Sequence, residues 1–528
     1  MSFIVPEATV LPQGQMGSST PIALTMKNSM AVPVSSIPSV DWETFSAWAV
    51  KTVTNGGRFV TLFTLPEKTE LSLSNPAYTM VIVIAEDFSN QLYLLGTPVS
   101  GGFTSLTPEI PAANIAERIL CEEYNLLPAG HPWLKPVRFS RLPEEGGPVI
   151  GITDYYKIEG EEVHEVGVGP VHAGVIECGH FRFQCIGEEV MHLEISLGYH
   201  HRGVQKLLQT AAQTQAAHSR TLSLMEVIAG DSTVAHTWSY ATVIEALGKT
   251  KVSPHGQKIR SLALELERLA NHTGDLGALS GDAGFLPTQS YCGRLRGDWL
   301  NTTALLCGNR FSRGIVKPGG ANVYLDKETI AEIRKRINAT AKDVNGAVNL
   351  LWNSSSFMSR VSNLGAVSKE NALALGLVGP GARACGVNLD CRIQHPLQHL
   401  PEPPILQRKT RGDVLSRALI RHDEIKESVN YCLRLLDSFA VEKNPVPLNP
   451  ANEKLQPEHI AIGMVEGFRG EVFHIGVTDA EGKLAGYTIV DASVHNWPGL
   501  ALALRNQEIS DFPLCNKSFN LSYCGHDL

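Results

Sequence analysis

The sequence lacks three features that mark common classes of protein. No apolar stretch reaches the roughly 18 to 20 residues that a membrane-spanning helix needs. Lys and Arg number 45 against 53 Asp and Glu, and this balance argues against a nucleic-acid binder or a polybasic membrane-surface protein. The first ten residues lack the basic start and apolar run of a signal peptide. We therefore expect a cytoplasmic protein that binds no nucleic acid and whose partners are proteins.

Closely spaced cysteines are also lacking. The chain has 10 cysteines in 528 residues, and no two of them have Cys-X-X-Cys spacing. In a cytosolic chain this usage favours reduced, mostly buried thiols over a disulfide framework. Cys178, His180 and Cys185 resemble half of a metal site, but no second half with matching spacing follows.

The length and composition predict a globular protein with more than one core. A chain of 528 residues exceeds the usual size of a single domain, and its hydrophobic fraction of 43% is enough to fill two or more cores. Residues 1–40 are rich in Ser, Thr, Pro and Val without a helical or strand period, so we expect an extended arm there.

Residues 41–140 have the pattern of a small α/β domain. Asp41 is a candidate N-cap for a short helix, and Asn55 with the two glycines after it is a candidate stop. Runs rich in β-branched and aromatic residues then predict strands, and Pro111 opens a second helix. The predicted strands span Arg58–Leu65, Tyr78–Ala85 and Gln91–Val99, and the second helix spans Ala112–Tyr124.

Residues 141–165 begin with a charged, Pro- and Gly-rich run and are the predicted linker. The second domain, residues 166–528, has a hairpin pattern near Phe181–Leu197 and is mainly helical afterwards. Ser253 as an N-cap and Pro254 at the first helical position predict the start of its clearest helix. The Arg and Glu residues between the apolar positions of this helix are expected on a solvated or paired surface. A long helix over Gly412–Phe439 and strands over Gly463–Val490 complete an α+β fold.

The run Ser196–Leu207, with the sequence SLGYHHRGVQKL, carries a family resemblance. It resembles the GYxHRGxEKL segment of the large subunits of energy-converting nickel-iron hydrogenases and of the quinone-site subunit of respiratory complex I. Other family landmarks follow in order along the chain. They are Gly169–His172, Gly187–Val190, Glu265–Arg268 with His272, Gly379–Arg383, Asp390–Arg392, Val465–Glu466, Arg469–Glu471 with His474, and Asp511–Pro513.

The end of the first predicted domain has a resemblance of its own. Thr104–Asn114, Glu117-Arg118 and Gly130–Pro132 are similar to the PSLTPxxPAANWxERE and GHPD segments of the smaller hydrophilic subunit of complex I. That subunit is found fused ahead of some hydrogenase large subunits. The resemblance therefore implies a small complex I-like domain followed by a hydrogenase large-subunit-like domain.

The resemblance also shows what is missing. In the hydrogenases two Cys-X-X-Cys pairs hold a nickel-iron centre, because soft thiolates stabilise that metal. Ala229 and Ser232 occupy the first pair of positions here, and Ser522 and Gly525 occupy the second, with Cys524 one residue out of register. A methyl group cannot ligate, and a serine hydroxyl has a far higher pKa than a thiol. We expect no nickel and no other metal bound by this chain.

Gln205 agrees with this expectation. The family has a glutamate at this position, which is understood as a proton gate beside the nickel centre. Glutamine cannot titrate, so the gate and the metal that used it are both absent.

The polar residues that remain are candidates for an acceptor site. The resemblance makes Arg469, His172 and His236 catalytic candidates, and Arg202, Asp390, Arg392 and His180 cofactor-binding candidates. Arginine presents a planar fork of donors that suits an anionic or carbonyl-bearing ligand. Each residue taken alone has a purely structural alternative, as a buried and satisfied hydrogen-bonding group. Gly230 stands where complex I has the tyrosine that binds the quinone.

The resemblance implies a large subunit of a membrane-associated, complex I-like or hydrogenase-related oxidoreductase. Electrons would move toward a quinone or similar acceptor, coupled to ion translocation. Expected partners are an iron-sulfur small subunit, which would hold the clusters, and membrane-embedded antiporter-like and anchor subunits on the inner face of the cell membrane. The alternative is a non-catalytic scaffold that couples the iron-sulfur subunit to the membrane arm.

Overall fold

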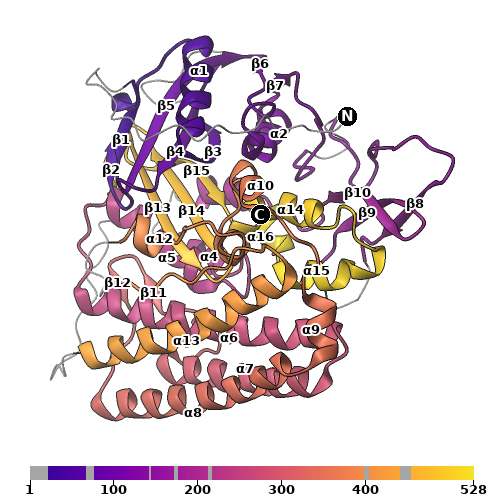
Figure 1. Cartoon of the computed structure of the whole chain (residues 1–528). Helices are drawn as coiled ribbons and strands as arrows, with labels where there is room; N and C mark the ends of the chain where they lie inside the picture. Colours follow the sequence, from indigo (N-terminus) through magenta and orange to yellow (C-terminus); the bar gives the residue numbers. More distant parts are fainter. Residues whose placement is uncertain are drawn as a thin grey trace.

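The computed structural model describes residues 22–66, 77–141, 144, 146–171, 176–211, 217–397, 403–439 and 454–528. Figure 1 shows an N-terminal sheet at one end of the molecule, long helices at the other, and a second sheet between them. Helices and sheets both contribute large parts, so the predicted α+β class is confirmed. Among the described residues, no helix is both long and apolar enough to cross a membrane.

The N-terminal sheet and its helices follow the predicted pattern. Asp41 caps α1 (Trp42–Thr54) by accepting a hydrogen bond from the Thr44 amide, and α1 ends at Asn55. Strands pair in the order β3-β4-β5-β6-β7, with β1 also paired to β5. The strands are β1 (Leu24–Met26), β3 (Arg58–Thr64), β4 (Ala77–Glu86), β5 (Gln91–Ser100), β6 (Gly102–Thr104) and β7 (Leu127–Ala129), and the second helix is α2 (Asn114–Tyr124).

Residues 22–40, part of the expected arm, join the two sheets. β1 pairs with β5 of the N-terminal sheet, whereas β2 (Ala31–Pro33) pairs with β13 of the second sheet. Between them the Asn28 side chain donates to the carbonyl oxygens of His395 and Met464 and accepts from the Met464 amide. This segment therefore ties the N-terminal sheet to the rest of the same chain.

The long helices pack into one bundle. Ser253 caps α6 (Pro254–Asp282), which packs against α7 (Leu286–Cys307) and α13 (Val414–Ser438), and α7 packs against α8 (Lys327–Trp352) (Figure 1). Most charged residues of α6 are buried in this bundle, where Arg260 pairs with Glu245 and Arg268 with Glu265. The expected pairing is thus present, but in the interior and not on a surface. The sequence period could not show this burial, because other elements cover the helix.

The second sheet lies between the bundle and the N-terminal sheet. Its order is β15-β14-β13-β2, formed by β13 (His459–Gly467), β14 (Gly470–Thr478) and β15 (Leu484–Val490). A third sheet contains β8 (Val163–Val168), β9 (His180–Ile186) and β10 (Glu189–Ser196), and a short ribbon pairs β11 (Val316–Lys317) with β12 (Gly320–Ala321). The remaining helices are α3 (Val204–Ala211), α4 (Ala217–Met225), α5 (Thr233–Leu247), α9 (Ser355–Val361), α10 (Lys369–Ala374), α11 (Gly379–Ala384), α12 (Cys391–Gln394), α14 (Ala492–Ala503), α15 (Phe512–Phe519) and α16 (Tyr523–Asp527).

Candidate functional site

The motif at 196–207 and the C-terminal segment meet in space. The Asp527 carboxylate accepts hydrogen bonds from the amides of Gly198 and His200, both at 2.9 Å. The amides of Arg202 and Val204 donate to the carbonyl oxygen of Leu528. The two stretches that carry the family resemblance at opposite ends of the second domain therefore form one site.

Arg202, a predicted cofactor-binding residue, holds this site together. Its guanidinium donates to the carbonyl oxygens of Val227 and Ile228 at 2.7 and 2.9 Å and to that of Cys524 at 3.2 Å. It therefore joins the segment before Ala229 to the segment around Gly525. These contacts are those of a positioning residue.

The four former ligand positions do not fit a metal. Ala229 is buried, and the Ser522 hydroxyl accepts a hydrogen bond from the Gly525 amide at 2.9 Å. Burial and the nearby Glu177 raise the pKa of the Cys524 thiol to about 12, so this sulfur stays protonated at neutral pH. Among the described residues, no group of three or more His, Cys, Asp or Glu side chains has a metal-binding arrangement.

An ion pair lies beside one of these positions, because Asp231 directly precedes Ser232. Both oxygens of Asp231 accept from Arg469, at 2.8 and 2.7 Å, and the Arg469 Nε donates to the carbonyl oxygen of Asn520. The cavity bordered by Gly230 and Asp231 has a volume of only about 10 Å³, which leaves room for at most one water. Arg469 does not line this cavity, and its guanidinium is bound by Asp231 and by the backbone of Asn520.

Asp231 is the residue that sequence reasoning missed. It lies between Ala229 and Ser232, at a position where the family motif has an isoleucine. An acidic residue replacing an apolar one, in the same motif that loses its cysteines, was the available signal. Charge that is introduced next to a retained arginine suggests a pair.

His236 belongs to a buried chain of hydrogen bonds. Its Nε2 lies 3.0 Å from Asp491, its Nδ1 lies 3.1 Å from His474, and His474 in turn lies 2.9 Å from the Tyr487 hydroxyl. Burial and the neighbouring His236 lower the pKa of His474, so that ring is neutral. Burial alone would raise the pKa of Asp491, but the hydrogen bond and charge of His236 lower it. This series of hydrogen bonds begins beside position 525, because a Cβ on Gly525 would lie 2.8 Å from the Asp491 Cγ.

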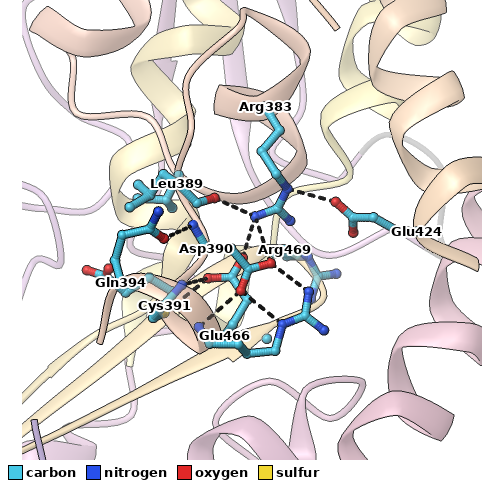
Figure 2. A network of polar contacts seen from close by, with 12 residues as sticks. Arg383, Leu389, Asp390, Cys391, Gln394, Glu424, Glu466 and Arg469 are labelled. Carbon is cyan, nitrogen blue, oxygen red and sulfur yellow. Dashed lines mark hydrogen bonds and ion pairs between the residues drawn. The ribbon is translucent and has the colours of Figure 1, made fainter. Parts of the chain in front are cut away.

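Asp390 and Arg392 lie in a separate charged network. Arg392 donates to Asp390 through Nε and Nη2 at 2.9 and 2.6 Å and to Glu265 at 2.7 Å. Figure 2 shows Arg383 beside Asp390. The Arg383 guanidinium donates hydrogen bonds to Glu424 and to Glu466, both at 2.7 Å. The predicted residues thus divide between the site at Arg469 and this network.

The structure describes only one of the two predicted residues His172 and His180. His172 lies outside the described residues. His180 begins β9, stacks near Tyr155 with ring centroids 5.4 Å apart, and has its pKa lowered by burial. The preceding Gly179 packs on Tyr523 of the C-terminal segment so closely that a Cβ would come within 2.6 Å of the ring. The start of β9 therefore borders the C-terminal part of the site.

Gln205 faces the N-terminal part of the chain. Arg138 donates to the Gln205 amide oxygen at 3.2 Å and to Glu123 at 2.9 Å. An amide at position 205 accepts this hydrogen bond without adding a charge. The residue therefore helps to dock the segment that contains Arg138 onto α3.

Comparison with known proteins agrees with this arrangement. Residues 282–457 match the family described as the 49 Kd subunit of respiratory-chain NADH dehydrogenase. The chain is 29% identical over 445 residues to formate hydrogenlyase subunit 5 of Escherichia coli, covering 80% of this chain and 76% of that protein. It is 28% identical over 347 residues to NADH-quinone oxidoreductase subunit 4 of Thermus thermophilus, covering 62% and 82%.

Two further comparisons concern the extent of the match. The carbon monoxide-induced hydrogenase of Rhodospirillum rubrum is 27% identical over 365 residues, covering 68% of this chain and 97% of that protein. A structure of the membrane-bound sulfane sulfur reductase, an archaeal respiratory membrane complex, contains the same fold, with a TM-score of 0.62 and 22% identity. The match covers 71% of this chain and 100% of the other. From these matches and the motifs above, the chain is a complex I-like, hydrogenase-related large subunit.

Proposed function

We propose that this chain is the large subunit of a membrane-associated oxidoreductase that passes electrons toward a quinone or similar acceptor, coupled to ion translocation and without nickel-iron hydrogen chemistry. The Asp231–Arg469 ion pair is the observation that carries the second part, because it binds Arg469 to an acidic residue that lies between two of the former ligand positions, Ala229 and Ser232. The relative that is named as an NADH-quinone oxidoreductase subunit supports the first part.

Restoring a metal site would require more than restoring thiolates. Gly525 has no room for a side chain, since a Cβ would lie 2.8 Å from Asp491 and 2.9 Å from the Ser522 hydroxyl. Asp231 would also have to leave Arg469, exposing a buried guanidinium. The loss of nickel chemistry therefore involves the surrounding structure as well as the four positions.

In the proposed acceptor site, Arg469 and His180 would contact the acceptor, and His172, which lies outside the described residues, stays a candidate for the same role. Arg469 would orient a carbonyl oxygen, and His236 would hold a proton through its hydrogen bonds to Asp491 and His474. For Arg469 to bind a ligand, Asp231 must first be displaced. Asp231 is 34% exposed at its side chain, so displacement into water is open to it.

A scaffold is the second candidate, and a specific observation favours it. The guanidinium groups of Arg202, Arg392 and Arg469 donate hydrogen bonds to partners within the chain. Groups that are satisfied in this way stabilise the fold and need no ligand. In this case the chain would couple an iron-sulfur subunit to the membrane arm without contacting the acceptor.

The proposed assembly follows from the motifs and the relatives. We assign residues 41–140 to a small hydrophilic complex I-like domain, residues 141–165 to a linker and residues 166–528 to the large-subunit domain. The match to the carbon monoxide-induced hydrogenase is consistent with this division, because it covers 97% of that protein but only 68% of this chain, which leaves a further part of this chain. An iron-sulfur small subunit would hold the clusters, and antiporter-like and anchor subunits would place the chain peripherally on the inner face of the membrane.

Acceptor reduction by membranes that contain the native assembly tests this proposal. The informative variant is Arg469→Lys, which keeps the charge but loses the planar fork, with Lys335→Arg on the exposed face of α8 as the control. An acceptor site predicts a raised KM for the quinone with Arg469→Lys alone. Unchanged KM and kcat in an assembly that stays intact would favour the scaffold, and hydrogen evolution would contradict both.

A further inference from the structure

The network around Arg383 contains more buried carboxylates than guanidiniums. Arg383 pairs with Glu424 and Glu466 and lies 3.7 Å from Asp390, and Arg392 joins Asp390 to Glu265. Arg268 completes the set, 3.3 Å from Glu265 and 3.8 Å from Glu424. The carboxylate network, as we define it, thus has four acids, Glu265, Asp390, Glu424 and Glu466, and three guanidiniums, Arg268, Arg383 and Arg392.

Glu466 is the member with the fewest cationic contacts. One oxygen accepts from Arg383, whereas the other accepts only from the Cys391 amide and thiol, at 3.1 and 3.0 Å (Figure 2). Its partner across the sheet is Glu471, which is itself paired with Arg58. The charged groups that act on Glu466 are Asp390, Arg383, Arg392 and Arg268. Its hydrogen-bond partner Cys391 is also affected by Glu471, and Glu265, His395 and the uncharged Trp238 line the same cavity.

A cavity of about 240 Å³ borders this network. Its walls include Glu466, Glu265 and Arg392, together with Trp238 and His395. The indole nitrogen of Trp238 and Nδ1 of His395 are buried and have no hydrogen-bond partner among the described residues. Buried polar atoms without a protein partner, in a cavity with room for several waters, are the setting in which proteins hold ordered water. The cavity can therefore supply water to the Glu466 carboxyl.

Charge balance requires one more positive charge in this buried region. Four ionised carboxylates beside three guanidiniums would leave one buried negative charge uncompensated, which is costly. We propose that Glu466 is a proton-binding site, which holds the proton that balances the network and exchanges it through water in the 240 Å³ cavity. Burial and the neighbouring Asp390 raise the pKa of Glu466, against the opposing effect of the arginines.

His272 is the competing place for this proton. Its Nε2 lies 2.8 Å from Glu424, and its Nδ1 lies 3.8 Å from Asp275. The charge of Arg383 and the hydrogen bond from His272 outweigh burial and lower the pKa of Glu424, so that carboxylate is ionised. A proton on His272 would leave every acid of the carboxylate network ionised. The two arrangements therefore differ in whether a neutral carboxylic acid is present.

The network also reaches the site at Arg469. The side-chain amide of Asn520 donates to Asp275 at 2.6 Å, and the backbone carbonyl oxygen of Asn520 accepts from Arg469. Asp275 is held by Arg421 at 3.0 Å and lies beside His272. A change at Arg469 can thus alter the proton affinity of Glu466 electrostatically. Any use of the proton in ion translocation rests on the proposed function, whereas proton binding does not.

Infrared spectroscopy of the purified full-length chain tests the proton site, because a neutral carboxylic acid and a carboxylate absorb separately. We expect a carboxylic-acid band near neutral pH that is lost in Glu466→Gln and retained in Glu424→Gln, the matched control from the same network. Glu267, whose pKa is raised to about 8, contributes a separate band that both variants keep. The Glu466 band should fade from the wild-type spectrum as the pH rises, which tests the site without any substitution. No band lost in Glu466→Gln, or the same band lost in Glu424→Gln, would overturn the proposal.

Exchange into deuterated water tests the cavity. The Glu466 band should shift in the folded protein without unfolding, because water reaches the carboxyl. A band that shifts only on unfolding would contradict the water-filled cavity. These spectra need no electron donor or acceptor, so their failure is distinguishable from failure of the proposed acceptor activity.

Discussion

Replacing Glu267 with glutamine is expected to change how the stability of the chain depends on pH. Glu267 lies on α6 and is 9% exposed; one carboxyl oxygen accepts from the Val234 amide at 2.7 Å. The other oxygen is buried and has no partner among the described residues. Burial and the nearby Asp231 raise the pKa of Glu267 from its ordinary 4.5 to about 8. The carboxyl is therefore largely neutral in the folded chain at pH 7.

The sign and size of the effect follow from linkage. Between pH 4.5 and about 8 the folded chain binds a proton that the unfolded chain releases, so this stabilisation is present at low pH and is lost as the pH rises. Each pH unit is worth about 1.36 kcal/mol, which gives a loss on the order of 5 kcal/mol across the whole window as an upper limit. Glutamine cannot titrate and keeps an acceptor for Val234, so the variant should lack this loss.

Urea unfolding followed by tryptophan fluorescence measures the difference. Wild type and Glu267→Gln should have similar free energies of unfolding near pH 5, and the variant should be the more stable near pH 8.5. Glu332→Gln on the exposed face of α8 is the matched control and should follow wild type. Parallel pH dependence of wild type and Glu267→Gln would refute the reasoning.

Two further substitutions test the packing on which the account depends. Gly525→Cys should lower the melting temperature and disturb the C-terminal segment, because its Cβ would lie 2.8 Å from Asp491, whereas Gly230→Ala, with nothing within 4 Å of its Cβ, should melt like wild type. Arg58→Met should cost roughly 3 to 5 kcal/mol of unfolding free energy, because it leaves Asp87 and Glu471 without their shared partner at the junction of the two sheets. Arg294→Met, at an exposed pair, should cost far less in the same urea titration, and equal losses would contradict the role of Arg58.

The parts of the fold that were predictable are those with local causes. Asp41 caps α1 and Ser253 caps α6 through hydrogen bonds to amides three residues ahead, and such signals can be read from neighbouring residues. The strands near Arg58–Thr64 and Gln91–Ser100 likewise follow from their β-branched and aromatic runs. Boundaries shifted by only a residue or two.

The polar interior was not predictable in the same way. The Asp231–Arg469 pair joins residues 238 positions apart, and Glu265 is bound by Arg392, which is 127 positions away. From the sequence alone, a charged residue on a helix is predicted to be solvated unless its distant partner is known. For this reason α6 was expected to carry a paired or solvated surface, whereas the structure buries Glu265 and Arg268 in the carboxylate network and Arg260 beside Glu245.

The central claim is that the chain no longer supports nickel chemistry. Elemental analysis of the purified native assembly tests it most directly, with iron from the proposed iron-sulfur subunit as the internal reference for intact protein. We expect iron without stoichiometric nickel, because Ala229, Ser232, Ser522 and Gly525 supply no thiolate and Asp231 pairs with Arg469. One nickel per chain would contradict it.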